Sequence, residues 1–242
     1  MNPLVALVFT IVAAVIGNSN ADERMIAMQN PDLFGGDMLG IDGPFDVERN
    51  GIPGQQYRWP GGVVPYVIDP SLASRAGLIQ QGMANYHQYT CIRFVPRTNQ
   101  MNYIKIFMGQ GCYSNVGMVG GQQPVSLGNG CHYVGTVVHE LGHALGFYHE
   151  QNRSDRDSYL IIYAQNIQRG MEGNFAKLAP SQNLLLTTFD YNSIMIYGNK
   201  AFSKDGRSDT MVARNGQKLY DPFNKNGMDQ SDVQRVNKMY GC

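Results

Sequence analysis

The sequence lacks an excess of charge of either sign, because its 19 lysine and arginine residues are balanced by 19 aspartate and glutamate residues in 242. This balance gives no electrostatic reason to expect nucleic acid or an anionic membrane as a partner. Internal repeats and low-complexity tracts are missing too. With 43% hydrophobic and 16% charged residues, the chain can bury a sizeable core. We therefore expect one or two globular units that bind no nucleic acid.

The apolar run at the N-terminus is too short to cross a membrane. It covers the 13 residues from Leu4 to Ile16, LVALVFTIVAAVI, whereas a membrane-spanning helix needs about 20. Ser19 and Ala21 follow in the small-x-small arrangement that suits signal peptidase. We interpret residues 1–21 as a signal peptide and expect a secreted protein with no membrane span once it is removed. A buried strand or helix of a cytosolic protein is the alternative.

Cysteine is scarce, and its spacing excludes one kind of metal site. The four cysteines are Cys91, Cys112, Cys131 and Cys242. None of them forms a C-x-x-C pair, which argues against zinc bound by thiolates. An even number downstream of a signal peptide predicts two disulfides, and the sequence by itself permits three pairings.

Residues 22–49 lack a clear apolar period and are rich in glycine and in turns at proline. We interpret them as an extended pro-segment rather than a folded unit. Arg49 offers a trypsin-like cleavage point before Asn50. We therefore expect an activating protease to cut near Arg49 and to leave residues 50–242 as the working domain.

Signals for strands and helices become dense from residue 50 onward. β-Branched or alternating runs predict strands, and apolar residues at spacings of three and four predict helices. The expected strands are 63–68, 92–95, 103–107 and 124–127, and the expected helices are a segment after Pro70-Ser71 that reaches Tyr86, 133–145, and 231–240 with Ser231 as N-cap. Strands first with helices interspersed indicate an α+β fold.

One stretch carries the chemistry: His139-Glu140-Leu141-Gly142-His143-Ala144-Leu145-Gly146-Phe147-Tyr148-His149-Glu150. On a helix, His139 and His143 lie one turn apart on the same face and can bind one ion. Gly146 can adopt a positive φ and end the helix, so that the chain brings His149 back as a third ligand. Three imidazoles and one open position predict a catalytic site for one Zn²⁺ per chain. The alternatives are surface histidines on a helix and a metal site without catalysis.

A mechanism follows from this arrangement. Zinc lowers the pKa of a bound water from 15.7 to about 7 and stabilises the oxyanion of a tetrahedral intermediate. Glu140 lies beside the metal without having to bind it. We expect it to act as the general base and to pass the proton to the leaving amine.

The extended pattern H-E-x-x-H-x-x-G-x-x-H is that of the metzincins, and the sequence around it resembles one metzincin family, the astacins. The resemblance includes Glu150-Gln151-Asn152-Arg153 and Ser193-Ile194-Met195-Ile196-Tyr197-Gly198, and it extends from about Tyr57 to Cys242. It implies a zincin-like fold. A twisted mixed sheet with two long helices (50–149) and a loop-rich C-terminal subdomain (150–242) would be separated by the active-site cleft.

The resemblance also implies roles at the Met-turn. Met195 would form a hydrophobic base under the zinc ligands. Tyr197 would be an extra metal ligand that swings away to stabilise the transition state. The sequence departs from the family at Ile196, where histidine is common. That residue is no zinc ligand, so we expect activity to survive.

The same resemblance implies how the precursor is held inactive. Phe34-Gly35-Gly36-Asp37 is similar to the family's F-x-G-D motif, in which Asp37 would bind zinc in the zymogen only. Glu150 would pair with the new amino terminus at Asn50 after cleavage. The family's disulfide pattern would join Cys91 to Cys242 and Cys112 to Cys131.

Three functions remain to be compared. The favoured one is a secreted zinc endopeptidase made as a zymogen, and the others are a zinc-containing pseudoprotease that acts as a binding protein and a zinc hydrolase of non-peptide substrates. The intact Glu140 argues against a pseudoprotease. Residues 125–127 form a candidate edge strand at the cleft, which would bind an extended peptide. We expect His87 and His132 to be structural, and a glycan on the sequon at Asn152 to be disfavoured by the nearby third ligand.

Overall fold

The computed structural model describes residues 19–41 and 54–242. The predicted core of the signal peptide, Leu4–Ile16, and the predicted cleavage point between Arg49 and Asn50 lie outside these residues. In the described part of the chain, none of the helices has the length and apolar character needed to cross a bilayer.

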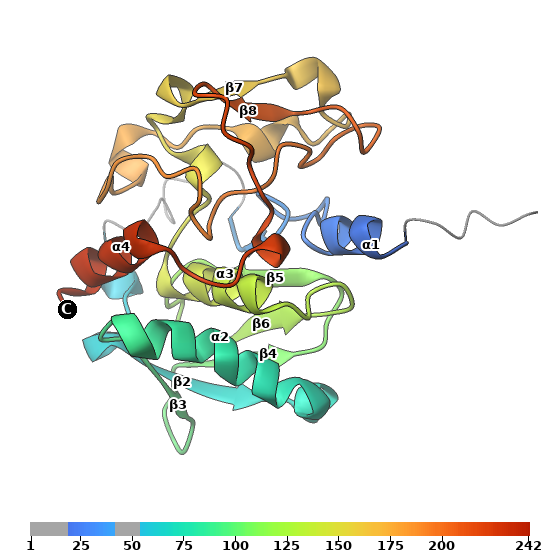
Figure 1. Ribbon diagram of the computed structural model, residues 1–242. Coiled ribbons are helices and arrows are strands. Elements are labelled where there is room, and N and C mark those ends of the chain that lie inside the picture. The colour runs from blue at the N-terminus through green and yellow to red at the C-terminus, as the bar shows by residue number, and fades with distance from the viewer. Residues whose placement is uncertain (1–18, 42–53) are drawn as a thin grey trace, which may run out of the picture.

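Six strands form a mixed sheet in the lower half of Figure 1. In spatial order they are β1 (Met38–Leu39), β5 (Cys112–Asn115), β6 (Gln122–Leu127), β4 (Tyr103–Phe107), β2 (Val63–Ile68) and β3 (Arg93–Pro96). β5 and β6 pair antiparallel, and the other neighbours pair parallel. The alternation in β4 is that of a strand with one buried face. Ile104 and Ile106 are fully buried, whereas Lys105 forms an ion pair of 2.9 Å with Asp69.

Two helices cover one face of this sheet, α2 (Ala76–Tyr89) and α3 (Val134–Leu145) (Figure 1). They approach closely at Gly82, where an added Cβ would lie 2.4 Å from a methyl group of Val137. Tyr86 packs in the same interface, and its hydroxyl donates a hydrogen bond of 2.7 Å to the carbonyl of Val138. The helix that carries the zinc motif is therefore fixed against both α2 and the sheet.

The C-terminal part of the chain forms a second, loop-rich layer in the upper half of Figure 1. Its regular elements are β7 (Leu160–Ile162) paired antiparallel with β8 (Met211–Ala213), and α4 (Gln230–Tyr240). The N-terminal segment, with α1 (Ser19–Ala27) and β1, runs between the two layers (Figure 1). Short 3-10 turns connect the elements at Gln55–Tyr57, Pro60–Gly62, Pro70–Arg75, Glu150–Asn152, Arg156–Ser158, Ala164–Asn166, Glu172–Phe175, Pro180–Gln182 and Pro222–Asn224.

Two disulfides join distant elements. Cys91–Cys242 ties the last residue to the turn after α2, and Cys112–Cys131 ties β5 to the loop before α3. These are the pairs that the resemblance implies. The α+β fold class is confirmed, with the mixed sheet, the two long helices and the loop-rich C-terminal part.

Three details of the sequence prediction are wrong. The helix after Pro70 begins as a 3-10 turn and becomes α-helical at Ala76. The N-cap of α4 is Asp229, whose side chain accepts from the amide of Asp232, and not Ser231. The candidate edge strand at 125–127 belongs to β6, which has β5 on one side and β4 on the other, because the glycine-rich stretch before it contains a further strand.

Candidate metal centre

The histidines of the motif meet at the C-terminal end of α3. His139 and His143 lie on that helix four residues apart, and both are fully buried. Gly146 ends the helix with φ 111°, a left-handed conformation that L-residues with a side chain rarely adopt. The reversed chain brings His149 back to the same point, where it is 1% exposed.

The Nε2 atoms of the three histidines form a nearly regular triangle with sides of 3.1, 3.2 and 3.2 Å. Carboxylate oxygens of Asp37 cap it at 3.0 Å from His139, 3.3 Å from His143 and 3.1 Å from His149. A tetrahedral zinc with bonds of about 2.0–2.1 Å would hold its ligand atoms about 3.3 Å apart. The four side chains can therefore hold one such ion.

Contacts with the backbone turn two of the rings toward this point. Nδ1 of His139 lies 2.8 Å from the carbonyl of Ile194, and Nδ1 of His143 lies 2.7 Å from the carbonyl of Phe147. A proton held at Nδ1 leaves the lone pair of Nε2 free for a metal. Burial lowers the pKa of His139 to about 4 and also lowers that of His149, so both rings favour the neutral form that metals bind.

Glu140 is a buried carboxylate whose two oxygens have no hydrogen-bond partner among the described residues. Burial, followed by the nearby charge of Asp37, raises its pKa well above the usual value. A carboxylate in such surroundings readily accepts and releases a proton, which is typical of a catalytic acid or base.

The Met-turn, residues 193–198, places Met195 and Tyr197 next to the metal centre. An added Cβ on Gly142 of α3 would lie 2.7 Å from the sulfur of Met195, so Met195 packs directly under the ligand helix. The ring of Tyr197 lies with its centroid 4.4 Å from that of His149. Its hydroxyl donates a hydrogen bond to Asp37 and lies 3.1 Å from the carbonyl of Met28. Burial and the charge of Asp37 raise the pKa of Tyr197 well above its usual value.

The N-terminal segment delivers Asp37 through a tight turn. Gly35 and Gly36 have φ values of 67° and 92°, and a Cβ on Gly36 would lie 2.5 Å from the carbonyl of Met28. Two further contacts hold the turn: the amide of Gly35 donates to the side chain of Asn174 at 2.9 Å, and the amide of Ser114 donates to the carbonyl of Asp37 at 2.9 Å. The phenylalanine-glycine-glycine sequence before Asp37 is thus what the geometry requires.

The segment then covers the sheet edge. β1 pairs parallel with β5 in the register Met38↔Ser114, and the side chain of Asn115 donates to the carbonyl of Leu39 at 3.1 Å. Without these residues, β5 would be the edge strand beside the metal centre. Its sequence, Cys-Tyr-Ser-Asn, has no apolar alternation, which is why sequence reasoning missed it.

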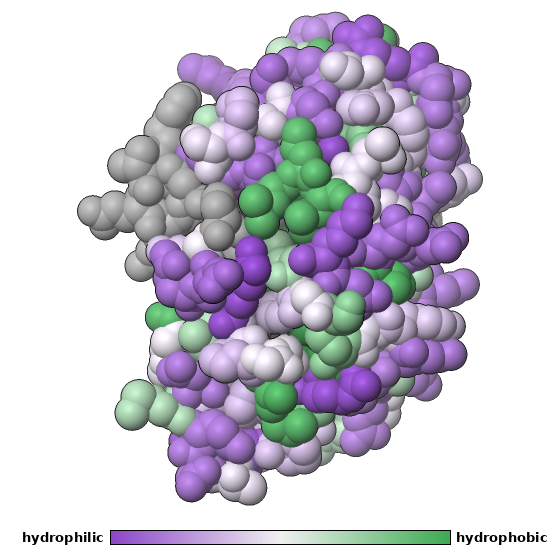
Figure 2. Space-filling view, turned by 90° about the vertical axis from the view of Figure 1, so that its left-hand side faces the viewer, coloured by the Kyte–Doolittle hydropathy of each residue, from purple (hydrophilic) through white to green (hydrophobic). Residues whose placement is uncertain are grey.

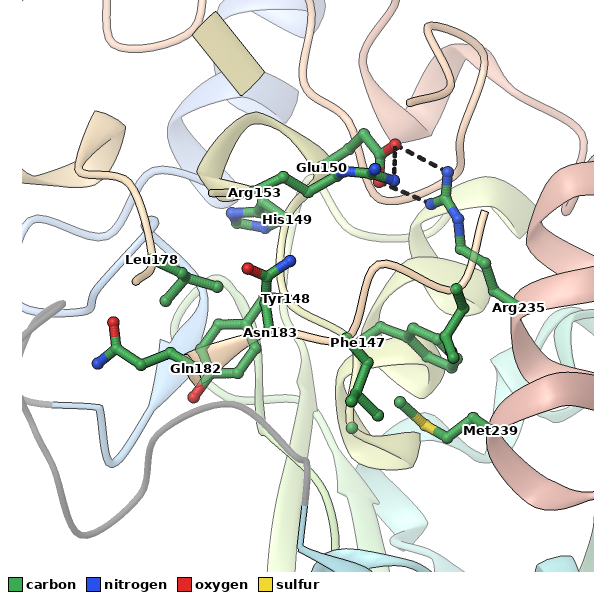
Figure 3. A pocket seen from close by; sticks show the side chains of 13 residues that line it. Phe147, Tyr148, His149, Glu150, Arg153, Leu178, Gln182, Asn183, Arg235 and Met239 are labelled. Carbon is green, nitrogen blue, oxygen red and sulfur yellow. Dashed lines mark hydrogen bonds and ion pairs between the residues drawn. The ribbon is translucent and has the colours of Figure 1, made fainter. Parts of the chain in front are cut away.

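Glu150, the residue after the third histidine, points away from the metal into a separate pocket (Figure 3). Arg235 contacts it at 2.7 Å and Arg153 at 3.1 Å, and the amide of Asp190 donates to it at 2.8 Å. Burial raises the pKa of Glu150, and the two arginines oppose that rise. Its predicted partner Asn50 lies outside the described residues.

Charged side chains gather around Glu150 at this pocket. The two arginines contact three carboxylates, because Arg153 also binds Asp155 at 2.8 Å and Arg235 lies 3.7 Å from Asp232. Burial raises the pKa of Glu150 and of Asp232, so a further positive charge near them would favour their ionised forms. Arg235 was missed by sequence reasoning, although its spacing of three from Asp232 on a helix is the signal of an ion pair.

Three polar residues of the sequence analysis have structural surroundings. Nε2 of His87 accepts from the amide of Phe94 at 2.9 Å, and Nε2 of His132 lies 3.1 Å from the carbonyl of Leu127. Asn152 is fully buried, and its amide donates to the carbonyls of Asn174 and Ala176. A glycan on Asn152 would have to displace these contacts.

Apolar side chains also reach the surface. On the face turned toward the viewer in Figure 2, the largest apolar group lies near the centre, and smaller ones lie below it. Exposed apolar side chains of the chain include Leu184 and Leu185, at 38% and 49% exposure, and Leu184 lines the pocket beside Glu150. The wall of that pocket is thus partly apolar, with Leu178 and Met239 on it (Figure 3).

Comparison with known proteins agrees with this geometry. Residues 52–241 match the model of the peptidase family Astacin. The chain is 44% identical to astacin-like metalloprotease toxin 1 of Loxosceles intermedia, over 91% of this chain and 87% of that protein. It is 42% identical to zinc metalloproteinase nas-15 of Caenorhabditis elegans, over 96% of this chain but only 44% of that longer protein. Among solved structures, high choriolytic enzyme 1 of Oryzias latipes, a hatching enzyme zinc-protease, has a TM-score of 0.70 and 38% identity, covering 82% of this chain and 97% of its own.

Proposed function

The chain belongs to the astacin family of zinc metalloendopeptidases, and on this premise we propose that it is a secreted zymogen whose N-terminal segment blocks its own metal centre. The enzyme hydrolyses peptide bonds of peptide or protein substrates. Beyond the activity of the family, we propose the roles of individual residues, the way in which the precursor is inhibited, and secretion of the protein.

Residues 139, 143 and 149 are proposed as the zinc ligands. Their converging Nε2 atoms fit the ion, and the backbone contacts of His139 and His143 fix which nitrogen faces it. Bound zinc supplies an acidified water and an electrophile for the scissile carbonyl. Glu140, unpartnered among the described residues, takes the proton of that water and gives it to the leaving amine. Tyr197, once Asp37 has left, donates its hydroxyl to the negative charge that develops on the carbonyl oxygen.

In the proposed precursor, Asp37 would hold the ion together with the three histidines, and its carboxylate would keep water away from that point. The hydrogen bond from Tyr197 and the pairing of β1 with β5 support this arrangement, because they hold the pro-segment on both sides of the metal centre. Cleavage near Arg49 separates residues 22–49 from the catalytic domain 50–242. Its two subdomains, 50–149 and 150–242, would then meet at an open centre.

The burial of Glu150 beside two arginines supports a second step of activation. Cleavage after Arg49 creates an ammonium group at Asn50, and a positive charge beside Glu150 would favour its ionised form. Two disulfides and the apolar segment before Ser19 support secretion, because disulfides persist in oxidising compartments.

The observation that carries the proposal is the meeting of three imidazole nitrogens with Asp37 at one buried point. Protein cut near Arg49 should digest an unfolded protein substrate, lose this activity in a zinc chelator, and regain it when zinc is added back. One zinc per chain should be present by elemental analysis. Cleavage that persists in the chelator would exclude a zinc mechanism, and stoichiometric zinc without any cleavage would favour the binding-protein alternative.

A further inference from the structure

Arg24 of the N-terminal segment lies outside the metal centre and against two aromatic rings. Its guanidinium carbon is 4.7 Å from the ring centroid of Phe223 and 5.4 Å from that of Tyr133. The two centroids are 6.3 Å apart and the rings are tilted by 55°, so they form two walls around the cation. Both distances are within the range in which a cation is attracted to an aromatic face.

The two walls are fixed to the catalytic helix. Tyr133 is the N-cap of α3, and Phe223 lies in the 3-10 turn Pro222–Asn224. That turn packs on the first turn of α3 so closely that a Cβ on Gly135 would lie 2.0 Å from the carbonyl of Pro222. Both rings are therefore anchored on the helix that carries His139 and His143.

The carboxylate of Asp221 completes this group of residues. We name Tyr133, Phe223 and Asp221 together the Arg24 cradle. Asp221 accepts a hydrogen bond of 2.8 Å from the amide of Gly198, the residue after Tyr197. Burial raises the pKa of Asp221, whereas the bond from Gly198 and the charges of Lys225 and Arg24 act to lower it. The cradle is thus hydrogen-bonded to the residue that follows Tyr197 of the metal centre.

The cradle is open on one side. Asp221 and Phe223 line an open hollow of about 1070 Å³ that Arg24 also lines. Lys225, the other cation whose charge acts on Asp221, donates its ammonium hydrogen bonds to the carbonyls of Ser193 and Ile196. Lys218 lies over the ring of Tyr220, 5.1 Å from its centroid. Arg24 is therefore the cation that the structure places on these two rings.

We propose that, once the pro-segment has left, the Arg24 cradle binds an arginine or lysine side chain of the substrate and so determines cleavage specificity. This inference rests on the proposed function. Along the pro-segment, the contacts come in the order cradle, metal centre at Asp37, and β5. A substrate paired with β5 would place its basic residue on the other side of the scissile bond.

The spacing of the pro-segment indicates how far that residue lies from the bond. Met28, whose carbonyl contacts Tyr197, lies four positions after Arg24 in the chain. At a helical rise of about 1.5 Å per residue this is roughly 6 Å. An extended substrate advances about 3.3 Å per residue and would cover this distance in about two residues.

The test compares peptides that differ at one position. Protein cut near Arg49 is first given a peptide library, and a basic residue should be enriched about two positions from the cut. Matched peptides with arginine or glutamine at that position are then compared. We expect kcat/KM to be fivefold to tenfold higher with arginine, and Phe223→Leu and Asp221→Asn each to reduce this ratio to below twofold. Binding is measured as well, on the Glu140→Ala protein. There the arginine peptide should bind more tightly than the glutamine peptide, and Phe223→Leu and Asp221→Asn should each reduce this difference.

A matched control uses another cation on an aromatic ring. Arg97 lies 4.0 Å from the ring centroid of Tyr103 on β4, and Tyr103→Leu should leave both peptides unaffected. The cradle assignment is overturned if the wild type shows no basic preference, or if the preference survives both cradle variants. Absence of any chelator-sensitive cleavage would contradict the proposed function instead, and the binding ratio on the Glu140→Ala protein would still decide about the cradle.

Discussion

The hydroxyl of Tyr197 donates a hydrogen bond to the carboxylate of Asp37, although 160 residues separate them in the chain. Both side chains are buried, at 1% and 0% exposure. Although burial alone would raise it, the pKa of Asp37 is held well below its usual value by His149 and His143. One carboxylate thus contacts the Met-turn and the histidines at once, and it does so from the segment that the proposed activation would remove.

Replacing Asp37 should therefore release activity from the uncut chain. We expect Asp37→Ala precursor to cleave a peptide at least tenfold faster than wild-type precursor, a barrier change of about 1.4 kcal/mol. The measurement uses freshly purified precursor, with gel analysis to show that residues 22–49 are still attached. Asp32→Ala serves as control, because Asp32 lies exposed in the same segment. Equal rates for the two variants would argue against the blocking role of Asp37.

Glu140 should be needed for turnover but not for binding the metal. For Glu140→Gln in the processed protein we expect kcat to fall by roughly 10²–10⁴, the usual contribution of a general base. The zinc content should remain one per chain, because the carboxylate oxygens are not among the atoms that converge on the metal position. Glu172→Gln, at an exposed position, is the control. A Glu140→Gln enzyme within tenfold of the wild type would remove this residue from the mechanism.

The stability of the fold should depend on pH through Asp190. Burial and a hydrogen bond with Asp229 raise its pKa to about 7, whereas an aspartate in the unfolded chain titrates near about 3.9. Between these values the folded protein holds more protons than the unfolded chain. The contribution of this carboxyl is thus largest below pH ~4 and is lost as the pH rises through ~7.

Asp190→Asn should accordingly melt higher than the wild type at pH 8, by about 2–4 °C for each kcal/mol gained in a protein of this size. At pH 5 the difference should shrink. Asp205→Asn is a control of opposite sign, since hydrogen bonds from Ser208 and Arg207 hold the pKa of Asp205 below its usual range. That variant should melt lower at pH 8. A difference between Asp190→Asn and wild type that does not change with pH would show that the carboxyl does not titrate in this range.

The two disulfides should contribute unequally to stability. Cys112–Cys131 closes 19 residues and Cys91–Cys242 closes 151. The chain-entropy model gives about 3 kcal/mol for the shorter loop and about 5 kcal/mol for the longer. Urea unfolding of the two double-serine variants measures both values, each serving as the reference for the other. A larger loss for the shorter loop would show that contacts in the folded state, rather than loop closure, decide the effect.

The parts of this structure that follow from local pattern could be predicted from the sequence. The alternation of Tyr103–Phe107 identified β4, and the spacing from His139 to His149 identified the residues that meet at the metal centre. In these segments, the spacing of the side chains along the sequence indicates which face of the strand or helix is buried.

The parts that depend on contacts between distant segments could not be predicted in this way. β5 carries buried polar residues such as Ser114, whose burial is favoured only because β1 and β6 satisfy its backbone. Likewise, Arg235 is an ordinary helical residue until the chain brings Glu150 to it from 85 positions away. The two aromatic walls around Arg24, Tyr133 and Phe223, come from separate regions, and no period connects them.

His149 and Glu150 are neighbours in the chain, but their side chains have different partners. His149 faces the metal position, whereas Glu150 contacts Arg235. A single peptide linkage therefore couples the two. Under the proposed activation, a positive charge that arrives at Glu150 would act on the residue next to a proposed zinc ligand. No intervening side chains would then be needed to link cleavage of the pro-segment to the metal position.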